Sequence, residues 1–197
     1  NAVLSICKSY ALLITRSYED ALPYAQAAEA NLTTEASSSV RGQFMSLKAQ
    51  LALFENRLDD GIQYARDALE YLDDEDQFFR NLTLNGLGQI MEMKGDVASA
   101  ADLYRQAFEE GWQAGDRLGA LVVFMNLVLS LNELGRRRDA VVWCKRVVAD
   151  IKSKVTYDVP FLDAVYLPWS LLEFEANELD RSREYSNRAL EILRAVN

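Results

Sequence analysis

The stretch KGDVASAADLYRQAF, Lys94 to Phe108, returns forty residues later in a related form, LGRRRDAVVWCKRVV, Leu134 to Val148. In both stretches a glycine is followed five residues later by alanine, and seven residues further on by a second alanine or a valine. The same spacing fits three more places, so a small residue recurs at intervals of 39 to 42 residues. These anchor positions are Ala21, Gly61, Ala100, Ala140 and Ser182. A repeat of this length predicts an array of similar supersecondary units.

Two further positions recur in step with the anchors. They are Ser9, Ala49, Gly88, Val128 and Ser170, twelve residues before, and Ala28, Ala68, Ala107, Val147 and Ala189, seven residues after. Each unit reads as two helices, such as 81–94 followed by 96–114, and small side chains where the two cross allow axes near the lower end of the ~8–10 Å range. One such hairpin cannot cover its own apolar stripe. We therefore expect an all-α fold in which about five hairpins stack.

The turns between the paired helices also follow a pattern. Gly95 and Gly135 are predicted to end the first helix of their units with a positive φ, and Asp96 to cap the second helix. Asn56 and Asn177 hold the same turn position in other units. Asparagine adopts this backbone conformation more readily than most residues, so we expect the same turn there.

Charge and composition exclude several functions. The 197-residue chain has a net charge of −9 and contains no histidine. An acidic surface repels phosphates, which argues against direct contact with nucleic acid. Without histidine or a GxxxxGK[ST] loop, we expect no catalysis, no metal and no cofactor in this segment. Four glutamates near the ends of the first helices are interpreted as surface charge: Glu92, Glu133, Glu173 and Glu175.

The longest apolar stretch and the two cysteines indicate the compartment of the protein and whether it contacts a membrane. The longest nearly apolar stretch, 118–131, is too short to span a bilayer, so no membrane contact is expected. Cys7 and Cys144 form no metal-ligand spacing and are read as buried thiols of a reduced, cytoplasmic protein.

The residues of the third unit resemble the tetratricopeptide pattern; they are Leu84, Leu87, Gly88, Met91, Gly95, Ala100, Tyr104 and Ala107. The resemblance covers the whole chain and implies one right-handed α-solenoid over residues 1–197. The long repeat, as in LALFENRLDDGIQYARDALEYL (51–72), further resembles the sensor array of the large ATP-dependent LuxR-type (MalT-like) regulators. In that family an NTPase module precedes the array and a helix-turn-helix follows it. The resemblance thus implies a fragment of a larger regulator that binds ATP in another domain.

In arrays of this type the first helix of each pair lines a concave face. The residues projected onto it are Gln43, Ser46, Gln50, Phe54, Asn85, Gln89, Met93, Met125, Leu129 and Asn132, followed by Leu171 and Phe174. Amides beside methionine and aromatic residues suit a neutral polar ligand or an extended peptide. We therefore expect a non-catalytic sensor for a small-molecule inducer or a protein or peptide partner. The alternative is a freestanding scaffold that binds a peptide or protein.

Overall fold

The computed structural model describes residues 1–15, 17–154 and 162–196. Every regular element in these ranges is an α-helix, which confirms the all-α prediction. The helices are α1 (Ala2–Thr15), α2 (Tyr18–Ala30), α3 (Ser38–Phe54), α4 (Leu58–Tyr71), α5 (Gln77–Met93), α6 (Val97–Ala114), α7 (Arg117–Glu133), α8 (Arg137–Lys154), α9 (Asp163–Glu175) and α10 (Leu179–Val196).

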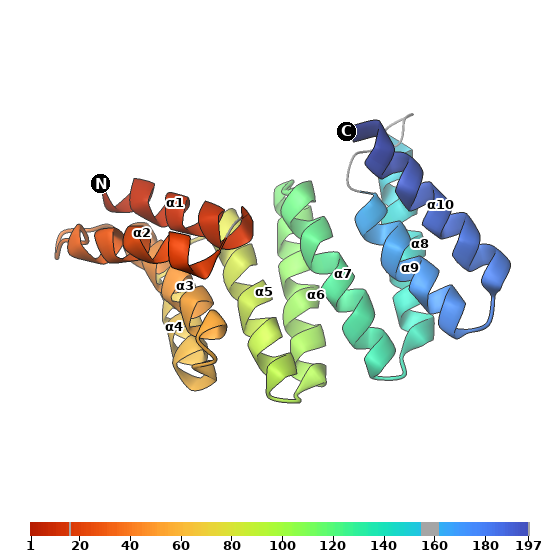
Figure 1. Cartoon of the computed structure of the whole chain (residues 1–197), viewed down its shortest axis with the longest axis horizontal. Helices are drawn as coiled ribbons and strands as arrows, with labels where there is room; N and C mark the ends of the chain where they lie inside the picture. Colours follow the sequence, from red (N-terminus) through yellow and green to blue (C-terminus); the bar gives the residue numbers. More distant parts are fainter. Residues whose placement is uncertain (16, 155–161, 197) are drawn as a thin grey trace. The chain divides into compact units, whose positions relative to one another are not determined.

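The helices belong to two compact units, residues 1–95 and 96–197 (Figure 1). In the first unit α1 pairs with α2 and α3 with α4, while α5 packs against both α3 and α4. In the second unit α7 packs against α6, α8 and α9, and α9 pairs with α10. The expectation that residues 1–197 form a single superhelical domain stays a prediction.

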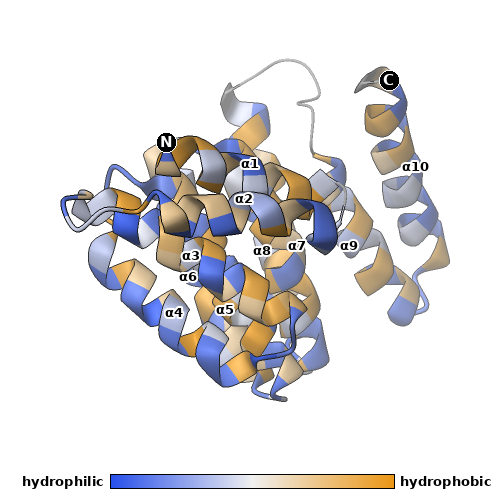
Figure 2. Ribbon diagram, turned by 60° about the vertical axis from the view of Figure 1, so that its left-hand side comes forward, coloured by the Kyte–Doolittle hydropathy of each residue, from blue (hydrophilic) through white to orange (hydrophobic). Residues whose placement is uncertain are grey.

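Small residues lie at the helix crossings, as the repeat predicts. In the α1–α2 hairpin the Ser9 hydroxyl donates a 3.0 Å hydrogen bond to the carbonyl oxygen of Ala21. In the α3–α4 hairpin a Cβ placed on Gly61 would lie 3.6 Å from the carbonyl oxygen of Ala49 and 3.7 Å from the Cβ of Ala52. The anchor therefore touches the position twelve residues before it in both hairpins. Gly61 is one of several buried small residues on α4, whose exposed positions are hydrophilic (Figure 2).

Two of the three anchor residues in the second unit are also fully buried. Ala100 and Ala140 have no exposed surface, whereas Ser182, the anchor nearest the C-terminus, is half-buried. The repeat thus predicts burial well for four of the five anchors, and the last hairpin keeps the pattern least.

The predicted turns are confirmed by the backbone. Positive φ angles occur at Gly95 (82°), Gly135 (71°), Asn56 (56°) and Asn177 (61°). Asp96 caps α6, since its carboxylate accepts the backbone N–H of Ser99 at 3.1 Å. Hydrogen bonds from the Ser99 hydroxyl and from the Ser99 backbone N–H lower the pKa of Asp96.

A second Gly–Asp pair, which was not predicted, forms the turn between α6 and α7. Gly115 has a φ of 86°, and the Asp116 carboxylate accepts the N–H of Gly119 at 2.9 Å. The chain therefore uses one local device, a left-handed glycine followed by a capping aspartate, both within a repeat and between two repeats.

A buried ion pair ties α8 to α9. Glu173 is only 4% exposed, which contradicts its interpretation as surface charge. Its carboxylate accepts the indole N–H of Trp169 at 3.0 Å and a guanidinium N–H of Arg137 at 3.2 Å. Arg137 also donates to the carbonyl oxygen of Leu172 at 2.9 Å. A buried charge needs such partners, because an uncompensated one is costly.

The two cysteines differ in environment. Cys144 is buried, and burial raises the pKa of its thiol to about 12, so the thiol stays neutral and unreactive at physiological pH. Cys7, predicted to be buried, is exposed on α1.

Candidate functional site

An exposed apolar surface runs along α7 and α9 in the second unit. Its seven residues, named here the apolar ridge, are Leu118, Val122, Met125 and Leu129 on α7 and Leu167, Leu171 and Phe174 on α9. Intervals of three and four residues place each set on one side of its helix. Their exposed fractions run from 36% at Leu129 to 60% at Phe174. Contiguous exposed apolar patches of this kind mark interaction sites in folded proteins.

The two halves of the apolar ridge are neighbours. Helices α7 and α9 pack against each other. At their C-terminal ends the side-chain amide of Asn132 donates a 2.6 Å hydrogen bond to the carboxylate of Glu175. Asn132 lies three residues after Leu129 and Glu175 four residues after Leu171, so both continue the two apolar stripes. The hydrogen bond therefore joins the stripes at one end.

The charges around the apolar ridge are confined to its ends. No charged residue occurs at 118–132 of α7 or at 164–172 of α9. Glu133 and Glu175 stand exposed at the C-terminal ends of the two helices. Helix C-termini carry a partial negative charge, which adds to that of the carboxylates. The ridge is therefore apolar along its length and acidic at one end.

The structure brings together most of the site residues predicted for this unit. Met125 and Leu129, with Leu171 and Phe174, are exposed and lie on the apolar ridge. Asn132 lies at its end, with its amide bound to Glu175. Leu118, Val122 and Leu167 were missed. Helix α7 is apolar on almost every side, so its periodicity does not show which apolar residues face outward.

In the first unit, two of the predicted residues serve the protein's own packing. Ser46 is 1% exposed, and its hydroxyl lies 2.6 Å from both the Tyr10 hydroxyl and the Thr83 hydroxyl. Its assignment to an open concave face is therefore wrong, because it joins α1, α3 and α5 in the core. Gln43 donates from its amide to Ser39 at 3.0 Å and to Asp76 at 3.1 Å.

The other predicted residues of the first unit are more accessible. Gln50, Asn85 and Gln89 are half-buried on α3 and α5. Phe54 and Met93, at the C-terminal ends of the same helices, are 53% and 55% exposed. Asn85 already has an interaction within the protein. The part of the predicted trough that lies on this unit is thus a mixture of engaged amides and two exposed apolar side chains.

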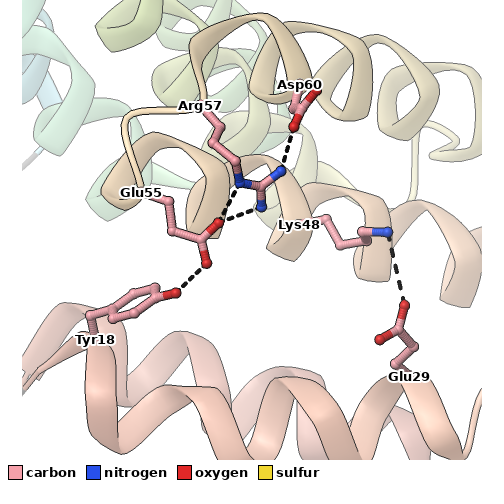
Figure 3. Close-up of polar contacts among 6 residues, drawn as sticks. All are labelled: Tyr18, Glu29, Lys48, Glu55, Arg57 and Asp60. Carbon is pink, nitrogen blue, oxygen red and sulfur yellow. Dashed lines mark hydrogen bonds and ion pairs between the residues drawn. The ribbon is translucent and has the colours of Figure 1, made fainter.

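A cluster of charged side chains lies next to Phe54, at the turn between α3 and α4 (Figure 3). The Tyr18 hydroxyl donates to the Glu55 carboxylate, and this hydrogen bond lowers the pKa of Glu55 and raises that of Tyr18. Arg57 donates to Glu55 at 2.6 Å and pairs with Asp60 at 2.5 Å. Each charge in this set has a partner within it, so the cluster attaches α2 to the α3–α4 turn and leaves no group free for a ligand.

Among the residues described, no three His, Cys, Asp or Glu side chains gather in a way that could hold a metal ion. No helix within the described ranges has both the length and the apolar character needed to cross a bilayer.

Similar architectures occur in solved structures. Aspartyl phosphate phosphatase F from Bacillus subtilis is 15% identical with a TM-score of 0.74, and the match covers 99% of this chain and 51% of that one. This chain thus spans about half the length of that protein. A putative kinesin light chain from Podosopora anserina with nearly identical TPR-like repeats is 13% identical, with a TM-score of 0.71 and coverage of 98% and 95%. BtubC (BKLC) from P. vanneervenii is 16% identical, with a TM-score of 0.68 and coverage of 100% and 89%. These likenesses show the fold.

Comparison of the sequence with known families identifies the family of the chain as well as its fold. No curated protein matches the chain. A family model described as the MalT-like TPR region matches residues 42–197, which is most of the sequence. It begins inside α3 and includes the apolar ridge. The chain therefore belongs to the family of MalT-like tetratricopeptide-repeat (TPR) regions.

Proposed function

We propose that this chain is the sensor module of a multidomain LuxR-type regulator in the cytoplasm, and that it binds an amphipathic helix of another protein along the apolar ridge. The observation that carries the proposal is the ridge itself, seven large apolar side chains exposed on the neighbouring helices α7 and α9. A helix that lays its apolar face into such a surface is a recurring mode of peptide recognition.

The chemistry of the apolar ridge favours a protein partner over a polar small molecule. A sugar-like ligand needs hydrogen-bond donors and acceptors placed around it. The amide of Asn132 is bound to Glu175, and Asn126, half-buried on α7, also has an interaction within the protein. The ridge would therefore bind a partner mainly through apolar contacts.

The acidic end sets the direction of the bound helix. Glu133 and Glu175 lie at the C-terminal ends of α7 and α9 and would attract lysine or arginine. The partner is therefore an amphipathic helix with an apolar face and basic residues at one terminus. Like charge at that terminus would be repelled, which gives the surface its selectivity.

A neutral polar inducer bound on the first unit is the second candidate. It is supported by Gln50 and Gln89, half-buried amides on α3 and α5 that have no hydrogen-bond partner among the described residues. Because each repeat contacts only its neighbours, a ligand on either unit could alter the stacking and so signal to adjoining domains. A GxxxxGK[ST] loop upstream and a helix-turn-helix downstream would support the regulator, with ATP bound there, over a freestanding scaffold.

Introducing a charged residue on the apolar ridge tests the proposed function. The probe is a displayed library of amphipathic helical peptides, half with basic residues at one terminus and half with acidic residues there. We expect basic-ended peptides to be selected, and Val122→Glu or Leu171→Glu to weaken the best of them by about 30-fold, since buried anchor residues contribute about 2 kcal/mol or more.

The matched control is Val142→Glu, which places the same charge on a 63% exposed valine of α8, away from the ridge. It should leave the affinity unchanged. Selection of acidic-ended peptides, or equal losses in all three variants, would refute the proposal. Self-association that both ridge variants abolish would show that the occupant is a second copy of the chain.

A further inference from the structure

A second site, separate from the apolar ridge, lies between α6, the start of α7 and α8. It is a cavity of about 400 Å³. Its lining residues are Phe108, Trp112, Gln113, Arg117, Arg146, Val147 and Asp150. The volume is within the ~300–1,000 Å³ range of small-molecule sites. No residue of the ridge lines it.

Aromatic rings hold the two arginines in place. The guanidinium of Arg117 lies 4.1 Å from the ring centroid of Trp112, and that of Arg146 lies 4.8 Å from the ring of Trp143. The Trp112 ring is itself fixed, because it stacks on Phe108 with centroids 5.1 Å apart. Arginine stacked on an indole keeps its in-plane N–H donors available for a second partner.

Neither of these arginines has a carboxylate partner in the part of the chain that is described. Several other arginines of the second unit do: Arg105 pairs with Asp102, Arg136 with Asp139, Arg137 with Glu173, Arg183 with Asp180 and Arg188 with Glu184. In a chain with 30 acidic and 21 basic side chains, carboxylate partners are in excess. Arg138, Arg181 and Arg194 also have no carboxylate partner among the described residues, so what distinguishes Arg117 and Arg146 is that both line the same cavity.

One carboxylate also lines the cavity, and it already accepts a hydrogen bond from another lining residue. Asp150 accepts the indole N–H of Trp112 at 3.1 Å and has a further interaction within the protein. Arg117 also donates one hydrogen bond to the carbonyl oxygen of Trp112. The lining side chains therefore carry a net charge of one positive unit. The two guanidinium groups and the amide of Gln113 supply the hydrogen-bond donors. A small anion matches this set.

We infer that the cavity binds the phosphate or carboxylate group of a small metabolite, with Arg117 and Arg146 donating to its oxygen atoms. Guanidinium groups bind such planar or tetrahedral oxyanions through paired charge-assisted hydrogen bonds. The Asp150 carboxylate limits the strength of binding, because it lines the same cavity and its negative charge repels the negative charge of the ligand. The chain would thus respond to an anionic metabolite independently of a partner helix on the ridge.

Titration of the full chain tests this site, with tryptophan fluorescence and calorimetry as readouts, because Trp112 lines the cavity and Trp143 holds Arg146. The probes are inorganic phosphate, a hexose monophosphate and succinate, with the uncharged hexose and chloride at matched ionic strength as controls. Saturation at or below about 1 mM is expected for at least one oxyanion. Phosphate and succinate distinguish a phosphate site from a carboxylate site.

Four variants decide the outcome. Arg146→Gln, at an exposed position where folding should not suffer, is expected to weaken binding about 10-fold, and Arg117→Gln similarly. Asp150→Asn, which keeps an acceptor for Trp112 and removes the opposing charge, should strengthen it several-fold. Arg183→Gln, a distant exposed control, should have no effect. Absence of saturable binding by every oxyanion, an unchanged affinity in Arg146→Gln, or weaker binding in Asp150→Asn would overturn the inference and leave the ridge proposal untouched.

Discussion

Replacing Glu173 by alanine is expected to lower the free energy of unfolding by about 3 kcal/mol. The substitution removes the acceptor of the Trp169 indole N–H and the partner of Arg137. Trp169 is only 6% exposed, so its N–H would be left in the core without an acceptor. The Arg137 side chain is 35% exposed and can regain some water, which keeps the loss at the lower end of the range for a broken buried pair.

Urea unfolding followed by circular dichroism measures this loss. Glu175→Ala is the matched control, since Glu175 is exposed on the same helix, and its effect should stay within about 0.5 kcal/mol. Glu173→Gln keeps an acceptor for Trp169 and should lose less than the alanine variant. If Glu173→Ala were no more damaging than Glu175→Ala, the buried pair would have no structural role.

Replacing Gly61 by leucine is also expected to reduce stability by about 3 kcal/mol, for a different reason. A Cβ added at this position would lie 3.7 Å from the Cβ of Ala52 and 2.7 Å from the Cδ1 of Ile90. Three further carbons have no space there, so α4 would have to move away from α3 or α5. Core overpacking of this kind cannot be relieved by a rotamer change when backbone lies on one side.

Two variants separate crowding from other effects of the substitution. Gly61→Ala meets only the mobile end of Ile90 and gains helix propensity, so its stability should change by less than about 1 kcal/mol. Arg66→Leu adds the same side chain at an exposed position of α4 and should be close to neutral. A Gly61→Leu protein as stable as Arg66→Leu would mean that the two helices do not meet closely.

Features set by neighbouring residues could be predicted from the sequence. The turns at Asn56, Gly95, Gly135 and Asn177 depend on the φ preference of a single residue, and all four were predicted correctly. The crossings were predictable because a small residue is required where two helices touch closely, and this requirement recurs in the α1–α2 and α3–α4 hairpins.

Features that join distant residues could not be predicted. Ser46 was placed on an open face because nothing local shows that Tyr10 and Thr83, 36 and 37 residues away, provide its hydrogen-bond partners. Arg137 and Glu173 are also 36 residues apart. The candidate site was predicted only in part for a related reason. On a helix as uniformly apolar as α7, the outward direction depends on which neighbours cover the other sides.

The recurring small residues mark the points where the paired helices touch in the α1–α2 and α3–α4 hairpins, and the repeat predicts the same contact between α7 and α8. Cysteine cross-linking tests it most directly, on a background without Cys7 and Cys144. The Cβ separation of 3.7 Å at positions 52 and 61 is suited to a disulfide. The equivalent positions in α7 and α8, set by the repeat, are 131 and 140.

We expect an intramolecular disulfide to form under mild oxidation both in Ala52→Cys with Gly61→Cys and in Leu131→Cys with Ala140→Cys. Pairs shifted by one residue, 53 with 61 and 132 with 140, should remain reduced. Efficient cross-linking of the shifted pairs, or failure of the 131–140 pair while 52–61 succeeds, would contradict a helix crossing at the same small residue in the two hairpins.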